Sequence, residues 1–216
     1  MSALSFSPTT GEAIALQEEL GRRVIERVTF GGIRTVAGVD VSVRGGTSYA
    51  AIAVLSFPGL DPVETVTAKR KTDFPYIPGL LAFREVPVIK QAFEKLKTRP
   101  DMLIIDGQGR AHPRGFGVAC HVGVELDTPS IGCAKSRLVG EYREPATERG
   151  SRTALRYNGE IVGSVVRTRE GVKPVFVSIG HRIDLETAVV FIMRTTTRYR
   201  LPEPIRMAHR AAGEAK

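Results

Sequence analysis

Three consecutive segments near the start of the chain have the pattern of β-strands joined by short turns. In residues 35–43 an apolar side chain stands at every second position from Ala37 to Val43, and residues 48–57 and 63–70 also have strand character. Four residues separate the first pair of segments, and five separate the second. Connections this short join antiparallel neighbours, so we expect a three-stranded meander.

The remainder of the chain mixes strand and helix patterns. Residues 102–105 form a wholly apolar run, which is typical of a strand covered on both faces. A helical pattern at 118–126 and a strand at 130–134 follow it, and such a unit should join parallel strands. We also expect a hairpin around Asn158-Gly159 and a strand at 175–179. The predicted class is α/β, with a mixed sheet flanked by helices in an order that resembles the RNase H-like arrangement.

Further segments have apolar residues at helical spacing. Residues 12–28 should form one amphipathic helix. A short helical stretch at 80–85 should end before Pro87, which we expect to open a new helix in its first turn. Asp184 should cap the helix that follows it. We expect a single domain over residues 1–216, with about 1–10 and 210–216 flexible.

The balance of charge favours a polyanionic partner. The chain has 31 Lys and Arg against 23 Asp and Glu, which gives a net charge of +8. Cations that neutralise phosphates release condensed counterions, although many proteins are basic for solubility alone. Part of the excess lies in residues 194–216, which could grip a nucleic-acid backbone or form a solvated tail.

Several classes of protein are disfavoured. No segment reaches the roughly 20 apolar residues that span a bilayer, and no phosphate-binding glycine motif indicates a nucleotide cofactor. Cys120 and Cys133 lie in apolar segments without metal-site spacing, which favours buried thiols in a reducing compartment. We therefore expect a cytoplasmic protein with no membrane partner and no small-molecule cofactor.

Two aspartates are candidates for a metal site. Asp40 lies mid-strand, on the face opposite a row of apolar side chains, and Asp106 follows an apolar strand and precedes Gly107. If the two strands are neighbours, the carboxylates meet, and their charges repel each other unless a cation lies between them. Mg²⁺ prefers such oxygen ligands. Taken singly, Asp40 could be a hydrogen-bonded buried residue and Asp106 a turn residue.

Three further side chains could assist these aspartates. Glu85 offers a third acid, and Lys135 closes the strand at 130–134, where an ammonium could reach a phosphate. His112 lies on the loop after Asp106 and could donate a proton or contact a phosphate. Each also has an ordinary alternative. Glu85 could be a surface residue at a helix break, Lys135 a solvated residue at a strand end, and His112 a loop residue without a catalytic role.

The loop at residues 75–79 is stiff, because Pro75 and Pro78 fix φ and restrict the residues before them. It should project Tyr76 and Ile77. Rigid apolar side chains unstack base steps, and enzymes that inspect a base commonly flip it out of the duplex. The alternative is a buried tyrosine that anchors the loop.

Six segments together resemble the endonuclease V family. They occur in family order and lie within a resemblance that runs from about Glu12 to His209. The two most specific are Pro75–Glu85 and Asp106–Arg114. The other four are Val39–Ser42, Gly132–Ser136, Gly180–Ile183 and Arg200–Pro204.

The resemblance implies a deoxyinosine 3′ endonuclease, a DNA repair enzyme that recognises deaminated adenine. Such an enzyme hydrolyses the second phosphodiester 3′ of the lesion and leaves a 3′-hydroxyl and a 5′-phosphate. The implied cofactor is Mg²⁺, with Mn²⁺ as a substitute. The implied partner is DNA containing deoxyinosine, with inosine-containing RNA as a further candidate.

The same resemblance implies roles for the acidic and basic residues. Asp40 and Asp106 would hold the metal, and Glu85 would be the third catalytic acid. Lys135 and His112 would be auxiliary phosphate or proton-transfer groups.

It also implies how the lesion is read. Tyr76, within the wedge of residues 75–78, would fill the space of the displaced base. His209 would be an auxiliary residue of the catalytic site, at a position where relatives carry His or Asp. Main chain would hold the extruded base around Gly79, Leu81, Gly107, Gly109 and Leu138.

Three other hypotheses share part of this pattern. A junction resolvase would have a similar acidic cluster but no need of the proline-bracketed tyrosine. A non-catalytic nucleic-acid-binding module would have lost carboxylates, and all three are present. An actin-like ATPase would need phosphate-binding glycine turns in two repeated halves, and that repeat is absent.

Overall fold

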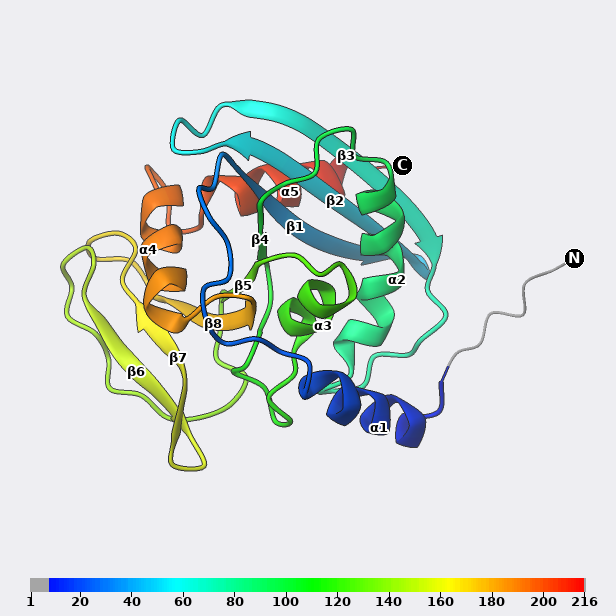
Figure 1. Ribbon diagram of the computed structural model, residues 1–216, viewed down its shortest axis with the longest axis horizontal. Helices are drawn as coiled ribbons and strands as arrows, with labels where there is room; N and C mark the ends of the chain where they lie inside the picture. The colour runs from blue at the N-terminus through cyan, green and yellow to red at the C-terminus, as the bar shows by residue number, and fades with distance from the viewer. Residues whose placement is uncertain (1–7, 216) are drawn as a thin grey trace, which may run out of the picture.

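The computed structural model describes residues 8–215, and its eight strands form one sheet in the order β3-β2-β1-β4-β5-β8-β7-β6 (Figure 1). The strands are β1 (Thr35–Arg44), β2 (Thr47–Ser56), β3 (Pro62–Lys71), β4 (Met102–Ile105), β5 (Ser130–Ala134), β6 (Arg152–Tyr157), β7 (Glu160–Val166) and β8 (Val175–His181). The helices are α1 (Thr10–Gly21), α2 (Leu81–Glu94), α3 (Val118–Glu125), α4 (Leu185–Thr195) and α5 (Glu203–Glu214). Within residues 8–215, no helix has the length and apolar composition needed to cross a membrane.

The sheet has the mixed topology expected from the sequence. β2 pairs antiparallel with both β1 and β3, which confirms the meander. β4 lies parallel to β1 on one side and parallel to β5 on the other. β8 then pairs antiparallel with β5 and with β7, whose hairpin partner β6 ends the sheet. β1 and β4 are therefore interior neighbours, held by hydrogen-bonded strands on both sides.

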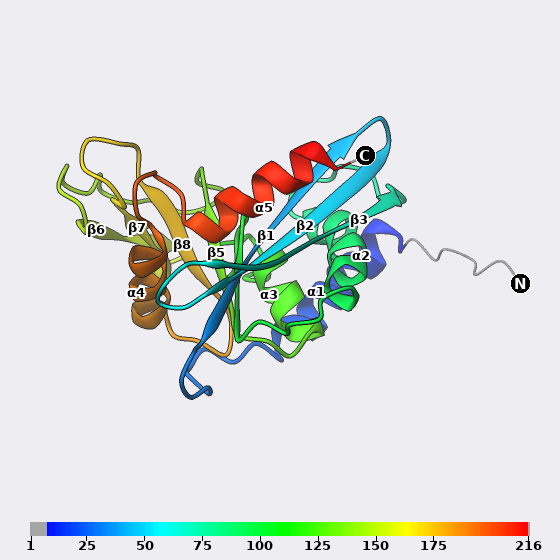
Figure 2. The same ribbon diagram turned by 90° about the horizontal axis from the view of Figure 1, so that it is seen from above.

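Helices cover both faces of this sheet, as the view from above shows (Figure 2). α2 and α3 share a buried cluster with Val39 and Ile52 on one face. α4 and α5 share a second cluster on the other face, where Ile192 and Ile205 join Val36. Asp184 caps α4 as expected, since its side chain accepts from the Thr187 amide at 2.7 Å.

No helix was predicted at the end of the chain, but α5 continues to Glu214 and so includes residues 210–214, which were expected to be flexible. The helix buries Ile205, Ala208 and Ala212 against the sheet. Arg44 at the end of β1 donates hydrogen bonds of 2.7–3.2 Å to three carbonyls in the last turn, at residues 212, 213 and 215. At the other end of the chain, residues 1–7 lie outside the described part, and residues 9 and 12 form a capping box that starts α1.

Two helices have other bounds than expected. α1 ends at Gly21 rather than at residue 28, because Val24 packs on Leu20 outside the helix and the Ile25 amide donates to Nδ1 of His181 at 3.3 Å. α2 continues through Pro87 as one helix. Its apolar face is buried on both sides of the proline, and this packing offsets the hydrogen bond that proline cannot donate.

Candidate active site

Two parallel strands bring Asp40 and Asp106 side by side. Val39 of β1 lies opposite Ile105 of β4, and the Asp106 amide donates to the Val39 carbonyl at 3.0 Å. The next residue along each strand is an aspartate. The expectation that these strands are neighbours is confirmed, and the two carboxyl groups meet where β4 ends.

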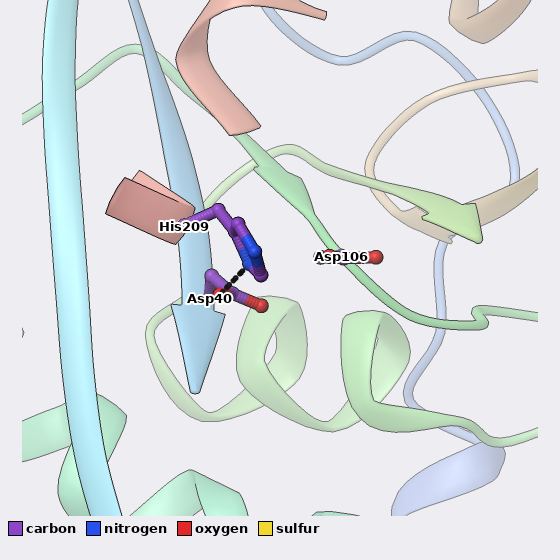
Figure 3. A group of neighbouring side chains, drawn as sticks. All are labelled: Asp40, Asp106 and His209. Atoms are coloured by element: carbon purple, nitrogen blue, oxygen red, sulfur yellow. Dashed lines mark hydrogen bonds and ion pairs between the residues drawn. The ribbon is translucent and has the colours of Figure 1, made fainter. Parts of the chain in front are cut away.

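His209 reaches the same point from α5 (Figure 3). Its Nδ1 lies 2.8 Å from Oδ2 of Asp40, and one ligand atom from each of Asp40, Asp106 and His209 lies within 4.8 Å of the others. α5 can approach β1 this closely because residue 38 is glycine. A Cβ at Gly38 would lie 2.0 Å from the carbonyl oxygen of Pro204.

Burial and mutual repulsion raise the pKa values of carboxyl groups around this cluster. Burial raises the pKa of Asp40, and the charge of Asp106 raises it further, against the lowering influence of His209 and Lys135. Burial and the charges of the two aspartates raise the pKa of Glu85, on α2, to about 8. Glu85 therefore lies close enough to sense both aspartates, although it is outside the group of ligand atoms within 4.8 Å of one another.

Lys135 places a positive charge against the cluster. Its Nζ forms an ion pair with Oδ2 of Asp106. The guanidinium of Arg200 donates to the Lys135 carbonyl at 2.6 Å and to the Pro174 carbonyl at 2.7 Å, which fixes the chain just beyond β5. Lys135, directly after β5, therefore faces the carboxylate of Asp106.

A cavity of about 320 Å³ opens beside Asp106 and Lys135. Four of the five residues expected to surround a base line it, namely Gly79, Leu81, Gly107 and Leu138. Gly109 is not among the residues that line it, and its predicted role in holding the base stays a prediction. Its amide donates to Oγ of Ser178 at 2.8 Å, and a Cβ there would lie 2.0 Å from the Ile179 carbonyl oxygen. Gly109 is thus a packing residue against β8.

The proline-bracketed loop forms one wall of the cavity. Tyr76 is 67% exposed, and residues 76–78 line the cavity, whereas Pro75 is exposed outside it. Ile77 is partly buried against Ala13 and Leu80, so only one of the two side chains expected to project does so. Ile77 anchors the loop, and Tyr76 is its free tip.

Comparison with known proteins identifies the family. A family model described as Endonuclease V matches residues 18–210. The chain belongs to the endonuclease V family. The endonuclease V of Dictyoglomus turgidum is 52% identical over 198 residues, which is 92% of this chain and 87% of the relative.

Solved endonuclease V structures share the whole fold. The crystal structure of the Streptomyces avermitilis protein has a TM-score of 0.93 and 42% identity, covering 99% of this chain and 95% of that one. The Ciona intestinalis endonuclease V was solved with a 23mer DNA containing an inosine followed by a ribo-adenosine. It is 31% identical, has a TM-score of 0.84, and covers 94% of this chain and 95% of that one.

Endonuclease V proteins are nucleases, and the donor set at this candidate active site fits a divalent cation. Two carboxylates and one imidazole converge from three separate elements. Burial, and after it the charge of Asp106, raises the pKa of Asp40, and a bound cation would favour the ionised carboxylate against both effects. Asp40 and Asp106 would supply the oxygen ligands and His209 a nitrogen ligand or a hydrogen bond to Asp40.

Three side chains hold the carbonyl oxygen of Gly79 at the base of the loop that carries Tyr76. Gln17 donates to it at 3.1 Å, Arg114 at 2.6 Å, and Nε2 of His112 lies 3.0 Å away. Nδ1 of His112 accepts from the Arg114 amide at 3.3 Å. Burial and the Arg114 charge lower the pKa of His112 to about 4. His112 has both ring nitrogens on backbone atoms and so positions the loop, while its role as a proton donor or phosphate contact stays a prediction.

Neither Gln17 nor Arg114 was predicted from the sequence to have a role. Arg114 lies in the family block that ends with it, which was a usable signal. Gln17 carried none, because a polar residue in an amphipathic helix is ordinarily solvated, whereas here it is 1% exposed and also accepts from Nε of Arg114 at 2.7 Å.

Proposed function

We propose that this protein is a DNA repair endonuclease that recognises deoxyinosine and hydrolyses the second phosphodiester 3′ of the lesion, leaving a 3′-hydroxyl and a 5′-phosphate. Its cofactor would be Mg²⁺, with Mn²⁺ as a substitute. The observation that carries the proposal is the contact between the two parts of the site. Tyr76, Asp106 and Lys135 all line the same cavity. If a flipped base occupies this cavity, the DNA strand to which the base is attached lies beside the acidic cluster.

The tyrosine loop suits the task of extracting a base. Tyr76 stands exposed, and the backbone behind it is fixed by the three donors to Gly79. A rigid aromatic ring can enter the space that a flipped base leaves, and stacking on its neighbours offsets part of the cost of unstacking. The inosine complex of the Ciona intestinalis relative supports this substrate class.

Backbone groups at the start of α2 could read the flipped base. The first N–H groups of a helix have no partner within that helix, and Leu81 and Ala82 begin α2 and line the cavity. Hypoxanthine differs from adenine in carrying an acceptor oxygen in place of the exocyclic amine. Helix N-terminal donors favour such an acceptor and are mismatched to an amine.

The side chains around the cluster would divide the chemistry among them. A divalent cation bound by Asp40 and Asp106 would polarise the phosphodiester and lower the pKa of bound water. Lys135 pairs with Asp106, and its positive charge would stabilise the phosphate beside the cation. Glu85, whose pKa is about 8, can take up or release a proton near neutral pH. His209 orients Asp40 through their 2.8 Å hydrogen bond.

We propose that the chain works as one domain in the cytoplasm. The eight strands of residues 8–215 lie in one sheet, and Cys120 and Cys133 are buried and free, as expected of thiols in a reducing compartment. We expect the hydrolysis to proceed without a small-molecule cofactor.

The test is product mapping on matched substrates with Mg²⁺. A labelled duplex with one deoxyinosine should yield a single nick at the second phosphodiester on its 3′ side, while the same duplex with deoxyadenosine stays intact. A strand with one inosine in RNA, tested in parallel, decides whether RNA is also a substrate. Equal cleavage of the two DNA duplexes, or cleavage confined to a four-way junction, would overturn the proposal.

A further inference from the structure

A second cavity, distinct from the one that Tyr76 borders, lies beside the acidic cluster. Its volume is about 440 Å³, and Lys135 is the one residue that lines both cavities. Asp106 borders the first cavity, and His209 borders the second. Because Asp106 and His209 offer ligand atoms within 4.8 Å of each other, the cluster lies between the two cavities.

The ionisable residues in the wall of the second cavity, apart from a tyrosine, are all basic. They are Lys135, Arg200, Arg206, His209 and Arg210, and the remaining lining residues are Tyr199 and Leu201. No acidic residue is among those that line it. A concave surface with several basic and no acidic residues is a site for an anion, and on a nuclease the available anion is the phosphate backbone.

Most of these cations are already held in place by the protein. Lys135 pairs with Asp106, and Arg200 donates to two carbonyls. Arg206 pairs with Glu203 at 2.5 Å and lies over the Tyr199 ring, 3.4 Å from its centroid. These contacts orient the wall before any ligand arrives.

Arg210 differs from the others. It is exposed, and within residues 8–215 no carboxylate forms a salt bridge with it. It follows Arg206 by four residues and His209 by one on α5, so it lies one turn above Arg206 on the helix that also delivers His209 to Asp40. The Asp40–His209 hydrogen bond therefore sets the position of the Arg210 charge relative to the acidic cluster.

We propose that this cavity holds the phosphate that follows the scissile phosphate on its 3′ side, with Arg210 as the residue that contacts it. The proposal rests on the proposed function, which sets the polarity of the strand. With the inosine base in the first cavity and the cut 3′ of it, the strand passes the acidic cluster and continues in the 3′ direction into the second cavity. The basic C-terminal segment is then a backbone-gripping surface.

The experiment removes one charge from the protein and one from the DNA, separately and together, and compares the effects on binding. A methylphosphonate linkage removes the charge of a single phosphate, either next to the scissile phosphate on its 3′ side or 5′ of the inosine. Binding of each deoxyinosine duplex is measured by fluorescence anisotropy in EDTA, where no cleavage occurs. The proteins are the wild type, Arg210→Gln, Arg210→Lys and the control Arg27→Gln, which removes an exposed cation between α1 and β1.

In the wild type, the neutral 3′ linkage should weaken binding by about tenfold, as expected for one charge-assisted contact. In Arg210→Gln the same linkage should cost less than about twofold, because its partner is already gone. Arg210→Lys and Arg27→Gln should keep the wild-type sensitivity. The slope of log K against log salt should fall by about 0.9 in Arg210→Gln only.

Equal sensitivity of wild type and Arg210→Gln to the 3′ linkage would overturn the proposal, as would coupling to the 5′ linkage instead. Cleavage of the unmodified duplex by the wild type with Mg²⁺ is measured in parallel. If cleavage is intact and coupling is absent, only the assignment of the second cavity fails. If the deoxyinosine duplex is not cut, the proposed function fails, and the assignment fails with it.

Discussion

The imidazole Nδ1 of His209 lies 2.8 Å from Oδ2 of Asp40, and this contact ties the last helix of the chain to an interior strand of the sheet. The two residues are 169 positions apart in the sequence. α5 is therefore part of the acidic site as well as a cover for the sheet, and removing the imidazole should disturb Asp40 without unfolding the helix.

We expect His209→Ala to lower Mg²⁺-dependent cleavage of a deoxyinosine duplex by about 10- to 100-fold, the range seen when a group that orients a metal ligand is lost. His209→Asp should retain more activity, because a carboxylate can also serve the cation. The measurement is kcat/KM as a function of Mg²⁺ concentration. A variant His209→Ala with unchanged kcat/KM and Mg²⁺ dependence would show that the contact is only structural.

Tyr76→Ala should weaken binding to deoxyinosine duplex by about tenfold, because stacking of one base on an aromatic ring contributes roughly 1–3 kcal/mol. Binding to undamaged duplex should change far less, since no base is displaced there. Tyr76→Phe keeps the ring and should bind like the wild type. Equal losses of Tyr76→Ala on both duplexes would make Tyr76 a general contact rather than a wedge.

Gly38→Ala should destabilise the protein by on the order of 1–3 kcal/mol, because its Cβ would lie 2.0 Å from the Pro204 carbonyl oxygen and would push α5 off β1. Gly31→Ala is the matched control, since a Cβ there has nothing within 4 Å. Thermal unfolding measures both variants. Cleavage by Gly38→Ala should also fall, because His209 moves with α5; a stable and fully active variant would contradict this packing.

Glu85 should make the metal-free protein less stable as the pH rises toward 8. Its folded-state pKa is about 8 against an ordinary value of 4.5, so the folded protein keeps a proton that the unfolded chain loses. The contribution of the protonated Glu85 to the free energy of unfolding is complete below pH 4.5 and is lost as the pH rises through 8. The pKa values of the buried histidines His112 and His121 are lowered from 6.5 to about 4. These two residues therefore change the stability of the protein with pH mainly below pH 6.5.

The measurement is the melting temperature in EDTA between pH 6.5 and 8.5. The wild type should lose stability across this window, and Glu85→Gln, which cannot ionise, should lose less. If the two proteins have parallel profiles, Glu85 is not held neutral by its surroundings.

Much of the fold follows from local sequence pattern. The alternation in β1 and the apolar run of β4 locate the two strands that matter, and the parallel neighbours they form place Asp40 beside Asp106. Asp184 at the start of α4 is equally predictable, since a side-chain acceptor ahead of an apolar helical pattern is a local signal.

What the sequence did not reveal depends on tertiary contact. α5 begins among prolines and carries a narrow buried stripe of Ile205, Ala208 and Ala212 between cations, so its pattern alone resembles a solvated tail. The helix is stable because it packs on β1 and β2. Gln17 and Gly109 likewise acquire their roles only from residues far away in the chain, at Gly79 and Ile179.

Side chains from β1, the end of β4 and α5 are proposed to bind a divalent cation at the place where the strand is cut. Mn²⁺ titration followed by electron paramagnetic resonance tests this proposal most directly, because bound Mn²⁺ loses the sharp signal of the free ion. Wild-type protein should remove Mn²⁺ from the free pool, and Asp106→Asn should remove far less at the same concentrations. Asp106→Asn that is folded and binds Mn²⁺ as tightly as the wild type would contradict the account.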